Sequence, residues 1–203
     1  MSQLAEAKTA YEQAIRFAPA FESAWDSLGY TYFNLHQYAA SNSAFERAIK
    51  LDPEDEKAWF HLGGNYYFLH EYVASNSAFE QALKLNPNDE EAWLRLGGNY
   101  FFLHQYAAAK NRFEQAIKLN PNNGRAWELL GASDWASGRF AAAQSELKQA
   151  IMLDSDDARA WSLLGSTYHH QGNRDGVIDA YQHLRKLNPE LADKLFNSAI
   201  LPH

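Results

Sequence analysis

Histidines are the first residues of this chain whose type and spacing could support chemistry. His36, His70 and His104 stand 34 residues apart, and imidazole nitrogens are common zinc ligands. Packed helices lie about 8–10 Å apart, whereas a Zn–N bond measures about 2.0–2.1 Å, so copies in adjacent structural units are poorly placed to share an ion. His169 and His170 are neighbours on an expected helix and point apart. We therefore predict no metal site and no cofactor, and we expect the repeated histidines to close turns or to pack.

Carboxylates are the second candidates. Asp134 interrupts a regular series of tyrosines, and a lone buried carboxylate has a raised pKa that suits acid–base catalysis. A hydrogen-bonded or partly solvated aspartate is the alternative that we favour. Asp154, Asp156 and Asp157 resemble a calcium loop in composition only, because the expected glycine and the closing glutamate are missing. The chain also lacks His-Glu-x-x-His, Gly-x-Ser-x-Gly and a phosphate-binding glycine loop, so we predict no catalytic residue and no enzyme.

The elements that must position these residues follow a fixed period of 34 residues. Five tryptophans mark this period: Trp25, Trp59, Trp93, Trp127 and Trp161. A leucine follows each tryptophan by three residues and a glycine by four, and a large apolar residue, an alanine and a proline recur later in most units. Within one unit the apolar residues fall at helical spacing in two stretches. The period therefore indicates a helical hairpin that is copied along the chain.

The string Trp-x-x-Leu-Gly-x-x-Tyr, followed by Phe, Ala and Pro at fixed offsets, resembles the tetratricopeptide repeat family. The resemblance implies an all-α fold, an α-solenoid in which stacked antiparallel helical hairpins form a right-handed superhelix. It also implies a single domain over residues 1–203. We expect an N-terminal half-repeat helix at 3–17, five hairpins at 22–55, 56–89, 90–123, 124–157 and 158–191, and a C-terminal capping helix at 192–201.

The composition favours a soluble globular protein, with 46% hydrophobic and 21% charged residues among 203. A net charge of −7 argues against a nucleic-acid binder. No apolar stretch reaches the roughly 18 residues of a membrane span, and the first residues lack the pattern of a secretory signal. We therefore expect no membrane insertion. The absence of cysteine excludes disulfides but leaves the compartment open, and we favour the cytoplasm over the periplasm.

The resemblance also implies a binding surface, because in this family the first helices of successive hairpins line a concave groove. We expect this groove to bind a peptide or an amphipathic helix of a partner protein. The predicted peptide-binding residues are Tyr30, Phe33, Lys57, Phe60, Tyr67, Phe68, Leu94, Arg95, Phe101, Phe102, Arg125, Trp135 and Arg159.

Phe68 and Phe102 give this prediction its main support, because a polar or basic residue is common at their position in the family. Exposed aromatic rings lower solubility unless a partner covers them. Gly64 and Gly98 lie one helical turn earlier, and their missing side chains are expected to open a recess. The basic residues among the predicted set would add a positive edge, so we expect a partner segment with acidic residues.

Two other interpretations stay open. The helix expected at 3–17 has no partner helix on one side, so Leu4, Tyr11 and Ile15 could make the chain oligomerise by docking onto another copy. The near-duplication of units 56–89 and 90–123 also fits a consensus-like or designed array without a specific ligand.

Overall fold

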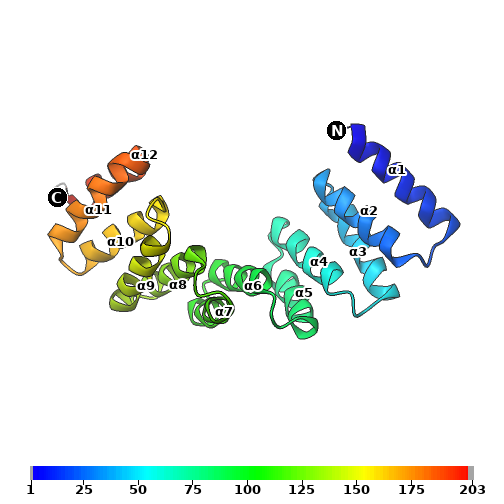
Figure 1. Cartoon of the computed structure of the whole chain (residues 1–203), viewed down its shortest axis with the longest axis horizontal. Helices are drawn as coiled ribbons and strands as arrows, with labels where there is room; N and C mark the ends of the chain where they lie inside the picture. The colour runs from blue at the N-terminus through cyan, green and yellow to red at the C-terminus, as the bar shows by residue number, and fades with distance from the viewer. Residues whose placement is uncertain (1, 201–203) are drawn as a thin grey trace. The chain divides into compact units, whose positions relative to one another are not determined.

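A computed structural model describes residues 2–200, and within them every regular element is helical. The chain divides into two compact units, residues 1–103 and 104–203, which we describe separately. The first unit holds α1 (Ser2–Phe17), α2 (Glu22–Asn34), α3 (Tyr38–Leu51), α4 (Glu56–Phe68), α5 (Tyr72–Leu85) and α6 (Glu90–Phe102) (Figure 1). The second holds α7 (Tyr106–Leu119), α8 (Gly124–Ala136), α9 (Phe140–Leu153), α10 (Ala158–His170), α11 (Arg174–Leu187), α12 (Pro189–Leu195) and a π-helical turn (Phe196–Ile200).

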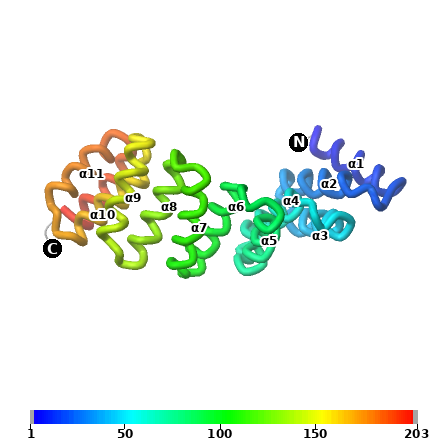
Figure 2. The backbone as a smooth tube through the Cα atoms, turned by 60° about the horizontal axis from the view of Figure 1, so that its bottom comes forward, coloured from blue at the N-terminus to red at the C-terminus, as the bar shows by residue number. Residues whose placement is uncertain are grey.

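In each unit, consecutive helices pack side by side as hairpins, which the backbone tube shows for α2 with α3 and for α8 with α9 (Figure 2). The predicted all-α solenoid class is confirmed. The last helix begins at Pro189 and continues as a π-helical turn to Ile200, whereas the sequence placed a capping helix at 192–201. The earlier start follows from Asn188, whose side chain accepts a hydrogen bond from the backbone N–H of Leu191 and caps the helix. Residue 201 lies outside the described residues.

Each of the five tryptophans that mark the period fixes the loop that precedes its helix. The indole Nε1 donates a hydrogen bond to the carbonyl oxygen of the residue six positions earlier, at 2.9 Å for Trp25 to Pro19 and 3.1 Å for Trp59 to Pro53. The same bond recurs from Trp161 to Ser155 at 2.9 Å, where proline is absent. Because the acceptor is a backbone carbonyl, the hydrogen bond is kept where serine stands in place of proline.

Small residues set the distance between the two helices of a hairpin. The rings of Phe45 and Phe79 are fully buried. A methyl group added at Gly29 would lie 2.8 Å from the Phe45 ring, and one added at Gly63 would lie 3.0 Å from the Phe79 ring. These glycines therefore let a phenylalanine ring pack directly against the backbone of the facing helix.

The adjacent glycines of α4 provide a test of this packing. We expect Gly63→Ala to lower the free energy of unfolding by about 1–2 kcal/mol, because overpacking outweighs the helix propensity of alanine. Gly64→Ala should raise it by up to about 1 kcal/mol, because no atom lies within 4 Å of a Cβ placed there. Urea denaturation followed by circular dichroism measures both. Shifts of the same sign would contradict the assigned helix crossing.

Buried polar groups join neighbouring hairpins of the first unit. Ser41 Oγ donates to the carbonyl oxygen of Gly29 at 2.7 Å and accepts from Asn65 Nδ2 at 2.7 Å. Ser75 and Asn99 repeat this pairing one unit later at 2.7 Å. In three other repeats alanine takes the position of Ser41, and the residue 24 positions later is a serine or threonine in place of asparagine. The hydroxyl of that residue donates to a backbone carbonyl of its own helix instead. The pairs are Ala7 with Thr31, Ala109 with Ser133, and Ala143 with Thr167. The residue types at the two positions are therefore matched, and the side-chain donor at each of these asparagine, threonine and serine positions has an acceptor.

The repeated histidines lie in the turns between paired helices. His36, His70 and His104 adopt φ values of 57°, 60° and 57°, in the left-handed region that Gly138 and Gly172 occupy in the later units. Each ring nitrogen Nδ1 lies 2.8–3.0 Å from the hydroxyl of the tyrosine two residues later. Among residues 2–200, no group of three or more His, Cys, Asp and Glu side chains could hold a metal ion. The histidines act as residues that close the turn.

Candidate functional site

Eight aromatic residues of the first unit gather where the ends of α2, α4 and α6 meet the starts of α3 and α5. We call them the aromatic face: Tyr30, Phe33, Tyr38, Tyr67, Phe68, Tyr72, Phe101 and Phe102. Exposed fractions are 50% for Tyr30, 44% for Phe68 and 50% for Phe102. Rings of this size that are half open to solvent supply apolar area for a partner.

Tyrosines of the preceding hairpin hold the exposed phenylalanines in place. The ring of Tyr38 stacks on that of Phe68, with centroids 5.3 Å apart and an interplanar angle of 3°. Tyr72 stacks on Phe102 at 5.3 Å and 9°. One face of each phenylalanine ring is therefore packed, while about half of each residue stays exposed to solvent. The sequence prediction missed these tyrosines, although their 34-residue spacing could have revealed them.

Glycines leave space on the same helices. No atom lies within 4 Å of a Cβ placed on Gly64 or Gly98. The equivalent residue of α2 is Tyr30, whose ring lies 5.5 Å from the ring of His61. The chain thus carries a large side chain at this position in one hairpin and none in the next two, and a recess that accepts a ligand there stays a prediction.

The remaining predicted residues of the first unit differ in exposure. Phe33, Tyr67 and Phe101 are half-buried within the aromatic face. Phe60 is also half-buried, but its ring packs edge-on at 5.5 Å against the buried ring of Phe79, so it belongs mainly to the core. Leu94 is only 5% exposed. Its predicted exposure in a groove is wrong, because the side chain is part of the hydrophobic interior.

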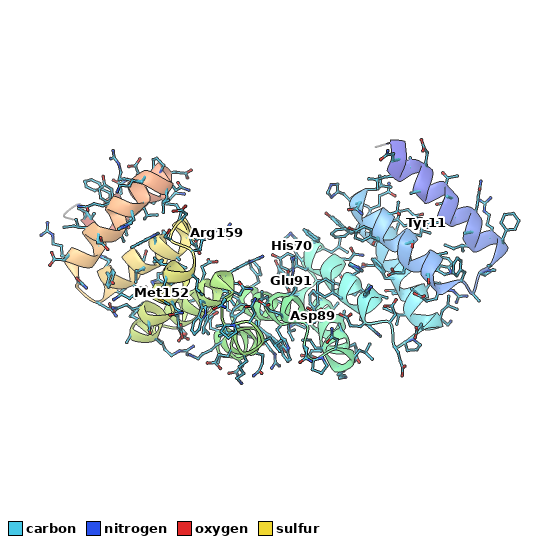
Figure 3. The ribbon with its side chains drawn as sticks, viewed as in Figure 1. Tyr11, His70, Asp89, Glu91, Met152 and Arg159 are labelled. Atoms are coloured by element: carbon cyan, nitrogen blue, oxygen red, sulfur yellow. The ribbon has the colours of Figure 1, made fainter. Side chains whose placement is uncertain are left out.

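The predicted positive edge is divided between the units. Lys57 is exposed, whereas Arg95 pairs with Glu91 through Nε and Oε1 at 2.6 Å, which neutralises its charge. Arg125 and Arg159 are exposed on the second unit, and half-buried Trp135 belongs to that unit as well. Figure 3 labels Glu91 on α6 and Arg159 on α10. Binding by these residues stays a prediction.

An acidic cleft opens beside the first turns of α2 and α4, with a volume of about 430 Å³. Six carboxylates line it: Glu22, Asp26, Asp52, Glu54, Asp55 and Glu56. Burial and the neighbouring charge of Asp55 raise the pKa of Asp26. Burial followed by interactions with other carboxylates also raises the pKa values of Glu22 and Glu56. The cleft therefore concentrates negative charge that its own residues do not balance.

Asp134 lies in a different arrangement, in the second unit. In the first unit, Tyr32, Tyr66 and Tyr100 donate their hydroxyls to glutamates 20 residues earlier at 3.0–3.1 Å. Asp134 takes the tyrosine position, is fully buried, and accepts hydrogen bonds from Lys110 Nζ and Arg139 Nε, each at 2.9 Å. An ion-pair network thus replaces the tyrosine pair.

The charges of this network explain the titration of its members. Burial tends to raise the pKa of Asp134, but hydrogen bonds from Arg139 and Lys110 outweigh it and hold the pKa below the ordinary value. The raised pKa that acid–base catalysis needs is therefore absent from Asp134, which matches the hydrogen-bonded alternative. Glu146 behaves oppositely, because burial and the adjacent Asp134 charge raise its pKa to about 7.

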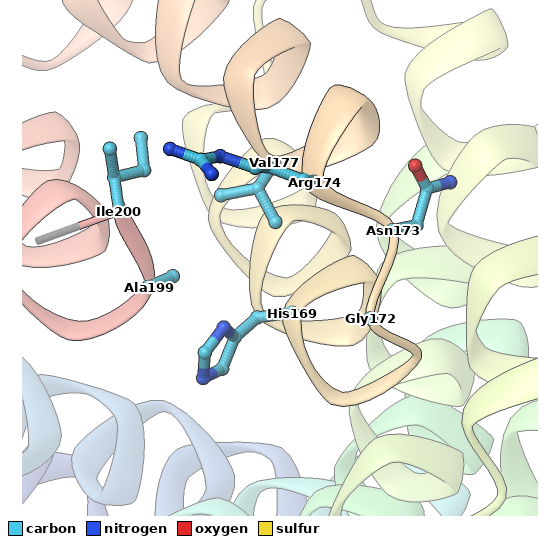
Figure 4. A pocket seen from close by; sticks show the side chains of 7 residues that line it. All are labelled: His169, Gly172, Asn173, Arg174, Val177, Ala199 and Ile200. Atoms are coloured by element: carbon cyan, nitrogen blue, oxygen red, sulfur yellow. The ribbon is translucent and has the colours of Figure 1, made fainter. Parts of the chain in front are cut away.

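A second cavity, of about 370 Å³, lies between the end of α10, the start of α11 and the π-helical turn. Val177, Ala199 and Ile200 form its apolar wall, and His169 lies across from them (Figure 4). Asn173 is at its rim, but its side chain already accepts a hydrogen bond from Gly176 and caps α11. The cavity therefore has an apolar wall on one side, and the exposed side chains of His169 and Arg174 also line it.

Helix α1 presents the surface that the sequence predicted for self-association. Tyr11, labelled in Figure 3, occupies the repeat position of the buried Phe45 and Phe79, yet it is only half-buried. Leu4 and Ile15 are half-buried too. Oligomerisation through these residues stays a prediction. Among residues 2–200, no helix is long and apolar enough to cross a membrane.

The repeat unit defines the class of this protein. Models of the tetratricopeptide repeat match residues 22–55, 69–133 and 134–195, which is most of the chain. The chain belongs to the tetratricopeptide repeat family. This fold is in general a scaffold for interactions between proteins.

Solved structures of other repeat proteins share the fold. YrrB, described as a TPR protein with an unusual peptide-binding site, has a TM-score of 0.78 and 21% identity over 90% of this chain and 95% of its own. MamA of Desulfovibrio magneticus RS-1 has a TM-score of 0.76 and 19% identity over 85% and 96%. PilF of Pseudomonas aeruginosa has a TM-score of 0.79 and 18% identity over 97% and 90%. At such identities the likeness shows the fold alone. No curated protein sequence matches the chain.

Proposed function

We propose that this protein is a non-enzymatic scaffold that binds a peptide or an amphipathic helix of a partner protein on the aromatic face of its first unit. The observation that carries the proposal is the half-open state of Tyr30, Phe68 and Phe102 on one face. A protein with no partner gains nothing from large exposed rings, which lower its solubility. The description of YrrB as having a peptide-binding site adds support from the same fold.

The rings are held ready for binding before a partner arrives. Tyr38 and Tyr72 stack on Phe68 and Phe102, so little side-chain entropy remains to be lost when the other side of each ring is covered. The open space at Gly64 and Gly98 would accept apolar side chains of the bound segment. Covering the exposed part of such rings at about 25 cal/mol per Å² yields several kcal/mol before ordering costs.

A peptide-display library screened against the immobilised chain tests this function. For the peptides recovered, the double variant Phe68→Ala with Phe102→Ala should raise Kd at least about tenfold, which corresponds to about 1.4 kcal/mol. Circular dichroism should show unchanged helicity. Met152→Ala is the matched control, because it removes an equally prominent apolar side chain, 70% exposed, from the second unit.

A second variant blocks the site without removing a ring. Gly64→Tyr with Gly98→Tyr copies the side chain that α2 carries as Tyr30 and fills the open space. We expect it to fold and to lose peptide binding. Peptides that bind both double variants as tightly as the unchanged chain would refute the proposed site.

A further inference from the structure

The formal net charge of the protein lies entirely in one half of the chain. Residues 1–103 contain 14 acidic and 7 basic residues, whereas residues 104–203 contain 11 of each. The first half therefore carries the formal charge of −7 and the second half is neutral. Since the aromatic face belongs to the first half, its partner meets a negative potential.

The acidic cleft adjoins the aromatic face along α2. Asp26, which lines the cleft, and Tyr30, which belongs to the aromatic face, are four residues apart on this helix and so share one side of it. The ring of Tyr30 in turn lies 6.5 Å from that of Phe33. A segment lying along α2 can therefore contact carboxylates and aromatic rings together.

The carboxylates of the cleft outnumber its basic residues by six to one. Lys57 is the one basic residue among those that line it. Asp26 Oδ1 is buried and has no hydrogen-bond partner. Carboxylates crowded in this way are stabilised by a cation that approaches from outside. Such a cation relieves repulsion that the free protein retains.

Resting on the proposed function, we propose that the segment bound by the aromatic face carries arginine or lysine side chains that enter the acidic cleft beside Asp26. A guanidinium group pairs with carboxylates through two parallel hydrogen bonds and also stacks on aromatic rings such as Tyr30. The aromatic face provides the apolar part of the site, and the cleft favours a bound segment with positively charged side chains. This reverses the acidic partner that the sequence suggested, because Arg95 is neutralised by Glu91.

Three peptide libraries test the charge of the partner. All three sample Trp, Phe, Leu and Ile at the same positions, and their polar positions hold only Arg, only Gln or only Glu. Fluorescence anisotropy measures Kd of the best peptides at about 50 mM and about 500 mM salt. We expect the Arg peptides to bind at least about tenfold more tightly than the Gln peptides at low salt, and to lose most of this advantage at high salt.

Paired variants locate the effect in the cleft. Glu22→Gln with Asp26→Asn should weaken the Arg peptides at least about fivefold and leave the Gln peptides unchanged. Asp175→Asn with Asp193→Asn makes the same change in net charge on exposed residues of the second unit, and it should leave Kd for the Arg peptides within about twofold.

The outcomes separate this inference from the function on which it rests. Tighter binding of the Glu or Gln libraries, lost in the Phe68 and Phe102 double variant, would overturn the inference and keep the peptide-binding function. Equal weakening by both pairs of carboxylate variants would also overturn it, because net charge rather than the cleft would then decide. Binding to none of the three libraries would contradict the proposed function itself.

Discussion

Replacement of Trp161 by alanine is expected to lower the free energy of unfolding by about 3–5 kcal/mol. The indole is 8% exposed and lies in the core of the second unit. Its ring stacks on that of His183, with the ring centroids 4.0 Å apart and an interplanar angle of 6°, and its Nε1 donates a hydrogen bond to the carbonyl oxygen of Ser155. The change would leave a cavity, remove the ring that stacks on His183, and remove the hydrogen bond that holds the loop at Ser155. Urea denaturation followed by circular dichroism measures the loss.

Two further variants separate the contributions of the hydrogen bond and of burial to this loss of stability. Trp161→Phe keeps most of the buried ring and removes the hydrogen bond, so we expect a loss of about 1 kcal/mol from the bond and a smaller one from reduced packing. Trp93→Ala removes the equivalent tryptophan of the third full unit, which is only half-buried. It should cost less than Trp161→Ala, and the reverse order would show that exposure does not govern the contribution of this position.

Loss of the Lys110 charge is the second large effect that we expect. Lys110 Nζ lies 2.9 Å from Asp134 Oδ2 and 3.7 Å from Glu146 Oε1. Lys110→Met keeps the aliphatic stem but leaves both carboxylates without this cation, and only Asp134 retains Arg139. Removing one partner of a buried network costs about 3–5 kcal/mol. We therefore expect a loss of about 3 kcal/mol at pH 8, measured by urea denaturation.

The pH dependence of this loss identifies its cause. The pKa of Glu146 is raised from 4.5 to about 7 in the folded protein, so the folded state holds a proton more tightly than the unfolded state. Its contribution to stability is present below pH 4.5 and is lost as pH rises to about 7. Lys110→Met raises this pKa further, because a cation is removed. The variant should therefore be much closer to the unchanged chain at about pH 5.5 than at pH 8.

Two controls accompany Lys110→Met. Adding Glu146→Gln removes the carboxylate that has lost its cation, and the double variant should recover part of the stability at pH 8. Lys118→Met changes an exposed lysine of the same helix and should lie within about 0.5 kcal/mol of the unchanged chain. An equal loss for Lys110→Met at both pH values would argue for lost packing rather than for unbalanced charge.

The period of 34 residues was enough to predict the helical class, because tryptophan, glycine and phenylalanine recur where helices cross. Gly29 against Phe45 is this crossing in the structure. Spacing within one helix also indicated that Gly64 and Gly98 are open positions. The side of a helix on which a glycine lies follows from the sequence of that helix, without reference to other elements. The all-α class, which rests on this periodicity, is therefore confirmed.

Predictions that depend on neighbouring helices were weaker. Leu94 and Phe60 share the repeat position of Asp26, but Leu94 is covered and Phe60 packs against Phe79. Asp26 and Asp55 are far apart in the sequence, and only the stacking of α2 and α4 places them in one cleft. The charge of that cleft, and hence the partner we now infer, could not be obtained from residue types alone.

The matched serine and asparagine pairs give the hairpins a fixed order. Units 56–89 and 90–123 look interchangeable in sequence, yet an exchange would set the amide of Asn65 against Ala109, which has no hydroxyl to accept it. It would also leave the hydroxyl of Ser75 beside Ser133, whose own hydroxyl is already committed to Leu129. The order of these nearly identical repeats is therefore fixed by their buried side chains, and exchanging two of them would leave a buried amide without an acceptor.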